Sequence, residues 1–155
     1  MAIKSSRGGG PATKTVRPKK NYCFACGKNN PEGMHLKFAY DSRSNSFKCR
    51  FRLSKRYTGP PGHCHGGIIA TILDDAMSKL SKIRDVVAAT SRMTVQYLRP
   101  VPLHKTLRVE SRELSKRGRR LTRVAEIFDE KGKALARSRG VFVIINPEQV
   151  FRRKP

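Results

Sequence analysis

The sequence lacks any apolar run long enough to cross a membrane. A spanning helix needs about 20 mainly apolar residues in succession, and polar or charged residues interrupt every apolar run of this chain well before that length. No apolar signal-peptide core follows Met1. Residues 1–20 are basic and free of acids, as in mitochondrial presequences, but lack the apolar residues of an amphipathic helix. We therefore expect a cytoplasmic protein without a membrane span.

Acidic residues are scarce, which leaves a large excess of positive charge. Eleven Asp and Glu stand against 34 Lys and Arg, so the formal net charge is +23. Such a charge favours polyanionic partners: nucleic acid, an anionic membrane surface or a phosphate-bearing cofactor. However, the chain has no complete zinc finger, no RNA-recognition aromatic motif and no pair of recognition helices. The charge predicts weak, non-specific nucleic-acid binding at most, through a basic tail.

The cysteines do not complete a metal-binding motif. Cys23 and Cys26 have the Cys-x-x-Cys spacing of a zinc knuckle, and Cys64 lies between two histidines. A second Cys-x-x-Cys or His-x-x-x-His pair, which would complete a four-ligand zinc site, is missing. We therefore expect no metal, and partly buried thiols in a reducing compartment.

Composition divides the chain into one domain and two tails. Residues 1–21 combine a Gly-Gly-Gly-Pro stretch and six cations with almost no apolar side chains, which predicts a disordered basic tail. Residues 22–146 contain all the periodic segments and are long enough for one domain with its own core. Residues 147–155 begin with a proline and form a short basic C-terminal tail.

Six segments show the alternation of apolar and polar residues that is typical of β-strands. They cover residues 36–40, 46–53, 86–98, 106–114, 121–128 and 134–145. In the second of them, Phe47, Cys49, Phe51 and Leu53 are predicted to face the core. Glycine-containing turns at residues 116–119 and 129–133 predict hairpins between the last three strands.

A single segment, about residues 65–83, has helical periodicity. Its apolar side chains fall on one broad arc, formed by Ile68, Ile69, Ile72, Leu73, Ala76, Met77 and Leu80. Gly67, Ala70 and Asp74 lie on roughly the opposite side, and Asp75 lies on the flank. One helix packed on an antiparallel sheet is an α+β architecture. On spacing alone, Asp74 is either a solvated helix acid or a functional carboxylate.

The start of this helix is suited to binding an oxygen atom that becomes negative. Pro60, Pro61 and Gly62 prevent a helix just before it, and His65-Gly66-Gly67 opens it. Glycines at a helix start leave backbone N–H groups unshielded, at the positive end of the helix dipole. Such groups can stabilise a carbonyl oxygen during nucleophilic attack.

These residues and several flanking motifs resemble one enzyme family. Asp74 follows His65 by nine positions, as in the hotdog-fold acyl-CoA thioesterases, in particular the phenylacetate-pathway (PaaI-like) type. Segments 23–27, 30–36, 59–62 and 97–100 are also similar to members of this family. The resemblance covers roughly residues 22–145, which makes it far more specific than His-Gly-Gly alone.

The resemblance implies a hotdog fold, with a six-stranded antiparallel sheet wrapped around one long central helix. It also implies dimers, often paired into dimers of dimers, with active sites across the interface. By correspondence, the N–H of Gly66 polarises the thioester carbonyl, and Asp74 attacks the carbonyl carbon or activates a water. His65 holds the turn and contacts the substrate. No cofactor is implied; the partner is the acyl-CoA substrate.

Further residues are expected to assist. Thr90, seven residues before Tyr97, corresponds to a water-orienting hydroxyl in some relatives, and Ser91 is its neighbour. The expected substrate-binding residues are Gly67, Ser91, Arg92, Arg99 and Arg139, the arginines through the phosphates of CoA. The chain departs from relatives that carry Asn or Gln about six residues before the histidine, because residues 58–60 are Thr-Gly-Pro.

Two other classes of function compete with hydrolysis. One is a non-catalytic acyl-CoA-binding or nucleic-acid-associated hotdog protein with a basic tail. The other is a hotdog dehydratase or hydratase, which would use a helix-borne His or Glu; the Asp that follows His-Gly-Gly argues against it. A Cys64–His65 nucleophile pair is disfavoured because adjacent residues on a turn rarely point together.

Overall fold

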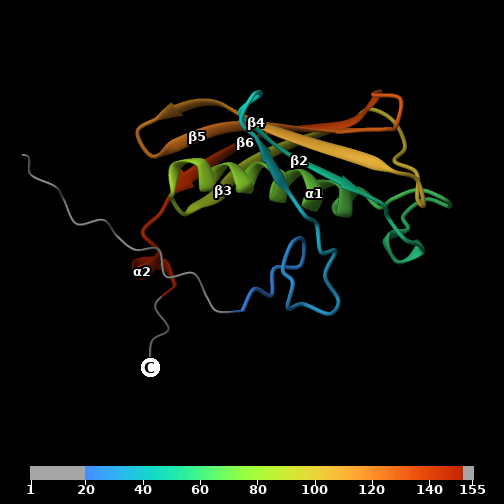
Figure 1. Ribbon diagram of the computed structural model, residues 1–155, viewed down its shortest axis with the longest axis horizontal. Helices are drawn as coiled ribbons and strands as arrows, with labels where there is room; N and C mark the ends of the chain where they lie inside the picture. The colour runs from blue at the N-terminus through green and yellow to red at the C-terminus, as the bar shows by residue number, and fades with distance from the viewer. Residues whose placement is uncertain (1–19, 152–155) are drawn as a thin grey trace, which may run out of the picture.

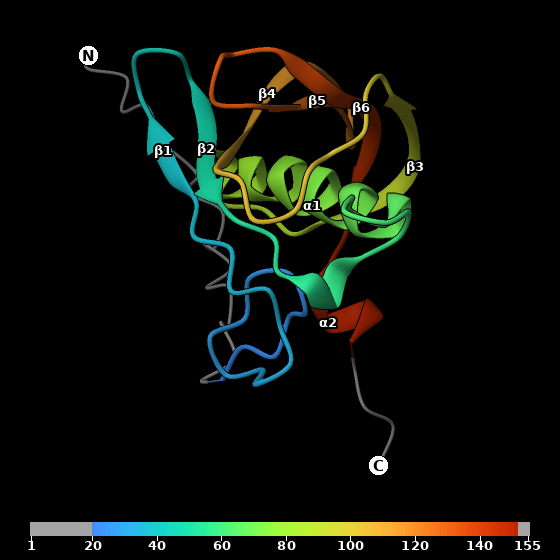
Figure 2. The ribbon, with the colours of Figure 1, turned by 90° about the vertical axis from the view of Figure 1, so that its right-hand side faces the viewer.

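The protein is built on one antiparallel sheet that wraps around a central helix. The structure is a computed structural model that describes residues 20–151. The sheet has six strands in the order β1-β2-β4-β5-β6-β3. Their bounds are β1 Ala39–Asp41, β2 Ser46–Phe51, β3 Ala88–Tyr97, β4 Leu107–Arg117, β5 Arg120–Phe128 and β6 Ala134–Ile144. The sheet curves around α1, Gly66–Ser78, which lies against its concave face (Figures 1 and 2). The predicted α+β hotdog architecture is thus confirmed.

The helical segment is slightly different from its prediction. One helix was predicted over residues 65–83. In the structure, α1 ends at Ser78, and the 3-10 helix η2, Lys79–Arg84, follows it directly. Asp85 closes it in the left-handed conformation, with φ of 49°. The predicted apolar arc is buried against the sheet, apart from Ile68, which is half-buried. Two short helices complete the fold, η1 Lys55–Tyr57 and α2 Pro147–Val150.

The first strand is shorter than predicted, because part of it pairs elsewhere. The backbone N–H groups of Met34 and Leu36 donate to the carbonyls of Phe24 and Ala25, at 2.8 and 2.9 Å. Met34 and Leu36 are therefore held within the N-terminal loop rather than by pairing with β2. This loop, residues 20–38, lies on the side of α1 opposite to the sheet (Figure 1), and it buries Ala25 and Leu36 in the core.

The predicted tails are largely beyond the described residues. Residues 1–19 and 152–155 are outside them, so the basic N-terminal tail is not described, and of the C-terminal tail only α2 and Phe151 are. In the described part of the chain, no helix is long and apolar enough to cross a membrane.

One arginine is buried completely in the core. Arg123 on β5 is 0% exposed and occupies an inward position between Leu121 and Ala125. Its guanidinium donates to the carbonyl of Met77 and to the Ser81 hydroxyl, at 3.1 and 2.8 Å. Its charge is paired with Glu113, 3.2 Å away. Burial lowers the pKa of Arg123 from its ordinary value, and the Glu113 carboxylate opposes that shift. One carboxylate therefore neutralises a fully buried cation.

Replacing Glu113 by Gln is expected to destabilise the fold by about 3 kcal/mol, because breaking a buried pair leaves an uncompensated charge in the core. Chemical denaturation, followed by circular dichroism, measures this change. Glu110→Gln is the matched control, since Glu110 pairs with Arg108 at the surface and surface pairs contribute 0 to about 1 kcal/mol. Equal losses in the two variants would contradict the assigned role of Glu113.

Candidate active site

The turn before α1 is held in place by His65. The His65 side chain caps the helix: its Nδ1 accepts a hydrogen bond from the Gly67 N–H at 3.0 Å. The segment that precedes the turn packs directly on His65, because a Cβ on Gly59 would lie 2.6 Å from the Cα of His65. An isolated bridge between Thr58 and Cys64 closes the turn. The His65 side chain therefore holds the first turn of α1 through this capping hydrogen bond.

The backbone N–H of Gly66 remains free. The amides of Gly67, Ile68 and Ile69 all bond back to His65. Within residues 20–151, the amide of Gly66 donates to no protein acceptor. It is the first amide of a helix of 13 residues, so the helix dipole adds to its positive potential. This arrangement can donate to a carbonyl oxygen.

A groove of about 370 Å³ lies beside this amide. Its lining includes Gly66, Ile69, Tyr97, Leu98 and Arg99. The Tyr97 hydroxyl donates to the carbonyl of Gly66 at 3.0 Å, yet the side chain is 55% exposed. Tyr97 was not predicted as a site residue. The sequence did contain one indication of its position: Tyr97 alternates with Val95 and Met93 along β3, so the three share a face of that strand. The groove is mainly apolar and opens next to a hydrogen-bond donor, as a site for an acyl thioester requires.

A carboxylate and a hydroxyl meet further along α1. The Thr90 hydroxyl on β3 donates to Asp74 Oδ1 at 2.7 Å. Asp74 is half-buried and Thr90 is exposed, so solvent reaches the pair. A β-bulge at Ser91 interrupts the pairing of β3 with β6 directly after Thr90. Bulges redirect side chains locally, and among residues 20–151 the hydroxyl that bonds to Asp74 is that of Thr90. Of the two predicted hydroxyls, the structure brings Thr90 to the acid.

The neighbouring acid points elsewhere. Asp75 is 8% exposed, and its Oδ1 lies 3.2 Å from the ammonium of Lys79 one turn later. It lies under the N-terminal loop, where Cys26 contacts it. This placement separates the two acids: Asp74 lies beside solvent and the edge strand, whereas Asp75 is enclosed.

The predicted arginines lie in two different places. Arg99 lines the groove beside Gly66, and its guanidinium donates to the carbonyl of Ala134 at 2.7 Å. Arg92 and Arg139 lie in a second groove, of about 480 Å³, which also contains Arg112 and Arg137. The second groove is on the convex face of the sheet, because the alternate residues of β5 and β6 face α1. Within one protomer, the structure does not bring Arg92 and Arg139 to Asp74.

Cys64 and His65 do not form a nucleophile and base. The Cys64 thiol is 4% exposed and donates to the backbone carbonyl of His65 at 3.5 Å, while the His65 ring is engaged with Gly67. Burial raises the pKa of the Cys64 thiol to about 11. A thiol in this environment stays protonated at neutral pH and is a poor nucleophile.

Comparison with known proteins places the site within a matched region. The family model described as thioesterase superfamily matches residues 61–136, which include the His-Gly-Gly turn, α1 and β3. The acyl-coenzyme A thioesterase THEM4 of Rattus norvegicus is 26% identical over 121 residues, which cover 76% of this chain and 52% of that protein. This chain therefore spans about half the length of that relative.

Solved structures share the architecture. A crystal structure of a thioesterase superfamily protein superimposes with a TM-score of 0.75 and 27% identity, over 79% of this chain and 60% of that one. The Escherichia coli PaaI protein of the phenylacetic acid degradation operon gives 0.66 and 19%, over 73% and 81% of the two chains. A Streptococcus mutans protein bound to acetyl CoA gives 0.66 and 15%, over 72% and 89%. The last two show a common fold.

Proposed function

Because the chain belongs to the thioesterase superfamily, we propose that it hydrolyses the thioester bond of an acyl-CoA to release a free acid and CoA. Support comes from a rat relative that is named an acyl-coenzyme A thioesterase, and from a structural neighbour bound to acetyl CoA. The observation that carries the proposal is the solvent-accessible Asp74 carboxylate bonded at 2.7 Å to the Thr90 hydroxyl. A carboxylate placed in this way is suited to base or nucleophilic chemistry.

The free amide of Gly66 acts on the carbonyl. Attack on a thioester moves negative charge onto the carbonyl oxygen, and an oriented N–H at a helix start stabilises that charge. The groove beside Gly66 receives the acyl or pantetheine part of the substrate, with Tyr97 and Leu98 as apolar walls. Arg99 at the same groove contacts a phosphate of CoA, and Arg92 and Arg139 offer further phosphate contacts in the basic groove.

Asp74 supplies the base or the nucleophile of the reaction. It either removes a proton from a water molecule that attacks the carbonyl carbon, or attacks that carbon itself. Thr90 orients the carboxylate through its hydrogen bond and can also hold the water. The bond between carbonyl carbon and sulfur then breaks, and CoA leaves as a thiolate that takes up the proton released by the attacking water. In the nucleophilic route the acyl group is first held on Asp74 as a mixed anhydride, which water then hydrolyses to the free acid. Thioesters are reactive enough that one base and one oriented N–H suffice without a triad.

Both groups act on one carbonyl only if two protomers combine. Gly66 and Asp74 are eight residues apart on α1, which corresponds to about 12 Å along the axis. A reacting carbonyl needs both within about 3 Å. We therefore infer a homodimer in which Gly66 of one protomer meets Asp74 of its partner. In the part of the chain that the structure describes, β3 is an edge strand with its outer side unpaired. It carries Thr90 and Tyr97, which makes it the interface we expect. Two such dimers can pair further.

The experiment that tests the activity is hydrolysis of an acyl-CoA panel, from aromatic to long-chain, with released CoA thiol as the readout. We expect turnover of at least one class well above the spontaneous rate. A matched panel of acyl-pantetheines, which lack the nucleotide phosphates, should show raised KM if the arginines bind those phosphates. Salt-sensitive binding of RNA with no hydrolysis of any acyl-CoA would contradict the proposal and favour a nucleic-acid-associated protein.

A further inference from the structure

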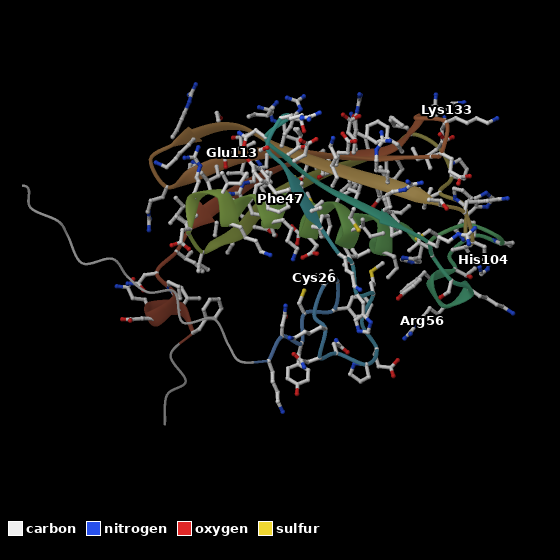
Figure 3. All side chains as sticks on the ribbon, viewed as in Figure 1. Cys26, Phe47, Arg56, His104, Glu113 and Lys133 are labelled. Carbon is white, nitrogen blue, oxygen red and sulfur yellow. The ribbon has the colours of Figure 1, made fainter. Side chains whose placement is uncertain are left out.

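A second cluster of reactive side chains lies where the N-terminal loop meets α1, apart from the proposed active site. Cys23 and Cys26 come from the loop, and Asp75 comes from the helix. One potential ligand atom from each lies within 4.8 Å of the other two. Figure 3 shows Cys26 on the part of the loop nearest to α1. Three ligand-type atoms from distant parts of the sequence therefore converge on one point.

The loop is shaped to present both sulfur atoms together. The Gly27 N–H donates to the carbonyl of Cys23 at 2.8 Å, which closes a tight turn around the Cys-x-x-Cys segment. A Cβ on Gly27 would lie 2.4 Å from the backbone nitrogen of Cys23, so this turn requires glycine. The Asn21 carboxamide adds a second restraint by accepting from the Cys23 N–H at 3.0 Å. The spacing of the two thiols is thus set by the backbone.

The helix side of the cluster has an unsatisfied oxygen. Asp75 is more than nine-tenths buried, and its Oδ1 contacts Cys26 Sγ at 3.4 Å and the Lys79 ammonium at 3.2 Å. Its Oδ2 is buried and has no hydrogen-bond partner among the described residues. A buried carboxylate oxygen without a partner is costly. A ligand that binds this oxygen would remove that cost.

We propose that Cys23, Cys26 and Asp75 bind a divalent cation that prefers thiolates, with Zn²⁺ as the expected ion and a solvent molecule as the fourth ligand. Two sulfur ligands and one oxygen ligand suit Zn²⁺. Cys23 is exposed, which leaves an open side for the solvent ligand. The Cys-x-x-Cys spacing alone predicted no metal, because the third ligand lies 49 residues after Cys26 in the sequence.

Lys79 completes the balance of charge around this site. Its Nζ lies 2.6 Å from Cys26 Sγ and 3.2 Å from Asp75 Oδ1, so it contacts two of the three ligands from outside. Two thiolates and a carboxylate carry three negative charges, which one divalent cation and the Lys79 ammonium neutralise together. Groups that bond to metal ligands in this way orient them and tune the site. Without the cation, the Lys79 ammonium and the Cys26 thiol contact Oδ1 of the buried carboxylate, and its Oδ2 has no partner among the described residues.

The bound cation would fasten the N-terminal loop to the central helix. Residues 20–38 contain no helix and no strand, since β1 begins only at Ala39, so the attachment of this loop depends on local contacts. A metal that joins this loop to Asp75, the residue after the proposed catalytic Asp74 in the sequence, adds a strong contact. Its effect is on the stability and position of the loop, because the ligands lie away from the Asp74–Thr90 pair.

Titration of the reduced, metal-stripped full chain with Co²⁺ tests this proposal. Binding through cysteine gives an intense thiolate-to-cobalt charge-transfer band, and we expect saturation at one ion per chain, followed by displacement by Zn²⁺. Cys23→Ser is the decisive variant because this side chain is exposed, and its affinity should fall by about tenfold or more. Cys26→Ser and Asp75→Asn should weaken binding as well.

The matched control is Cys64→Ala, which removes a buried cysteine outside the cluster and should leave the cobalt titration unchanged. Zinc should also raise the melting temperature of the wild type but not that of Cys23→Ser. No charge-transfer band in the reduced wild type, or equal binding by wild type and Cys23→Ser, would overturn the proposal. These readouts do not use hydrolysis, so they are independent of the proposed enzyme activity.

Discussion

Asp74→Asn is expected to lower kcat/KM for acyl-CoA hydrolysis by about 10²–10⁴-fold, the usual contribution of a general base. Asparagine preserves the shape of the side chain and still accepts the Thr90 hydrogen bond, but it neither removes a proton nor attacks a carbonyl carbon. Because Asp74 is half-buried at the surface of α1, no cavity results. Steady-state release of CoA, measured beside a thermal melt, separates lost chemistry from lost folding.

The adjacent acid supplies the control for this experiment. Asp75→Asn changes the same functional group one residue away, but Asp75 contacts Lys79 and Cys26 rather than Thr90. We expect a lower melting temperature with much less effect on kcat/KM. Thr90→Val should give an intermediate loss, because the carboxylate remains but loses its orienting partner. Equal loss of activity from both aspartate variants would contradict the assignment of Asp74.

Mixing two inactive variants is expected to restore activity if the site spans two protomers. Gly66→Pro removes only the N–H of the first helical residue, a position where proline is favoured. His65 has the extended conformation that must precede a proline, with φ of −64° and ψ of 137°. Loss of one oxyanion donor should cost about 10²–10³-fold in kcat. Alone, both Gly66→Pro and Asp74→Asn should therefore be nearly inactive.

In the mixture, each mixed dimer has one site with an intact Gly66 and an intact Asp74, from different chains. Half of randomly assembled dimers are mixed, and half of their sites are intact, so about one quarter of wild-type activity should return. A site contained within a single protomer would give none. Gly66→Ala, which keeps the N–H, is the control; its Cβ would lie 3.5 Å from the Tyr97 ring, an ordinary contact.

Regular periodicity predicted most of the fold. The helix, the five longer strands and their hairpins follow from apolar spacing, because each such segment must bury one face. The Asp74 side of α1 was also predictable from helical phase. The first strand was also predicted, but its late start at Ala39 was not. Residues 34–36 hydrogen-bond within the N-terminal loop, and a loop without periodicity gives no sign of its path.

Features that depend on tertiary contacts were missed for the same reason. The bulge at Ser91 changes which side chains of β3 face α1, so the strand pattern did not predict that Arg92 joins the convex face. The contact between Cys26 and Asp75 depends on how the loop crosses α1. Arg123 was not recognised as buried, because its acceptors come from α1, η2 and β4.

The strand order has a consequence for synthesis of the protein. Among the strands within residues 20–151, β3 pairs only with β6, the last of them to be made, and the two are separated in the chain by β4 and β5. During translation, α1 and β3 therefore leave the ribosome well before the sheet that covers them. Such non-local pairing gives a high contact order and slow folding, and it leaves an apolar helix face and a strand edge open to aggregation until β6 docks.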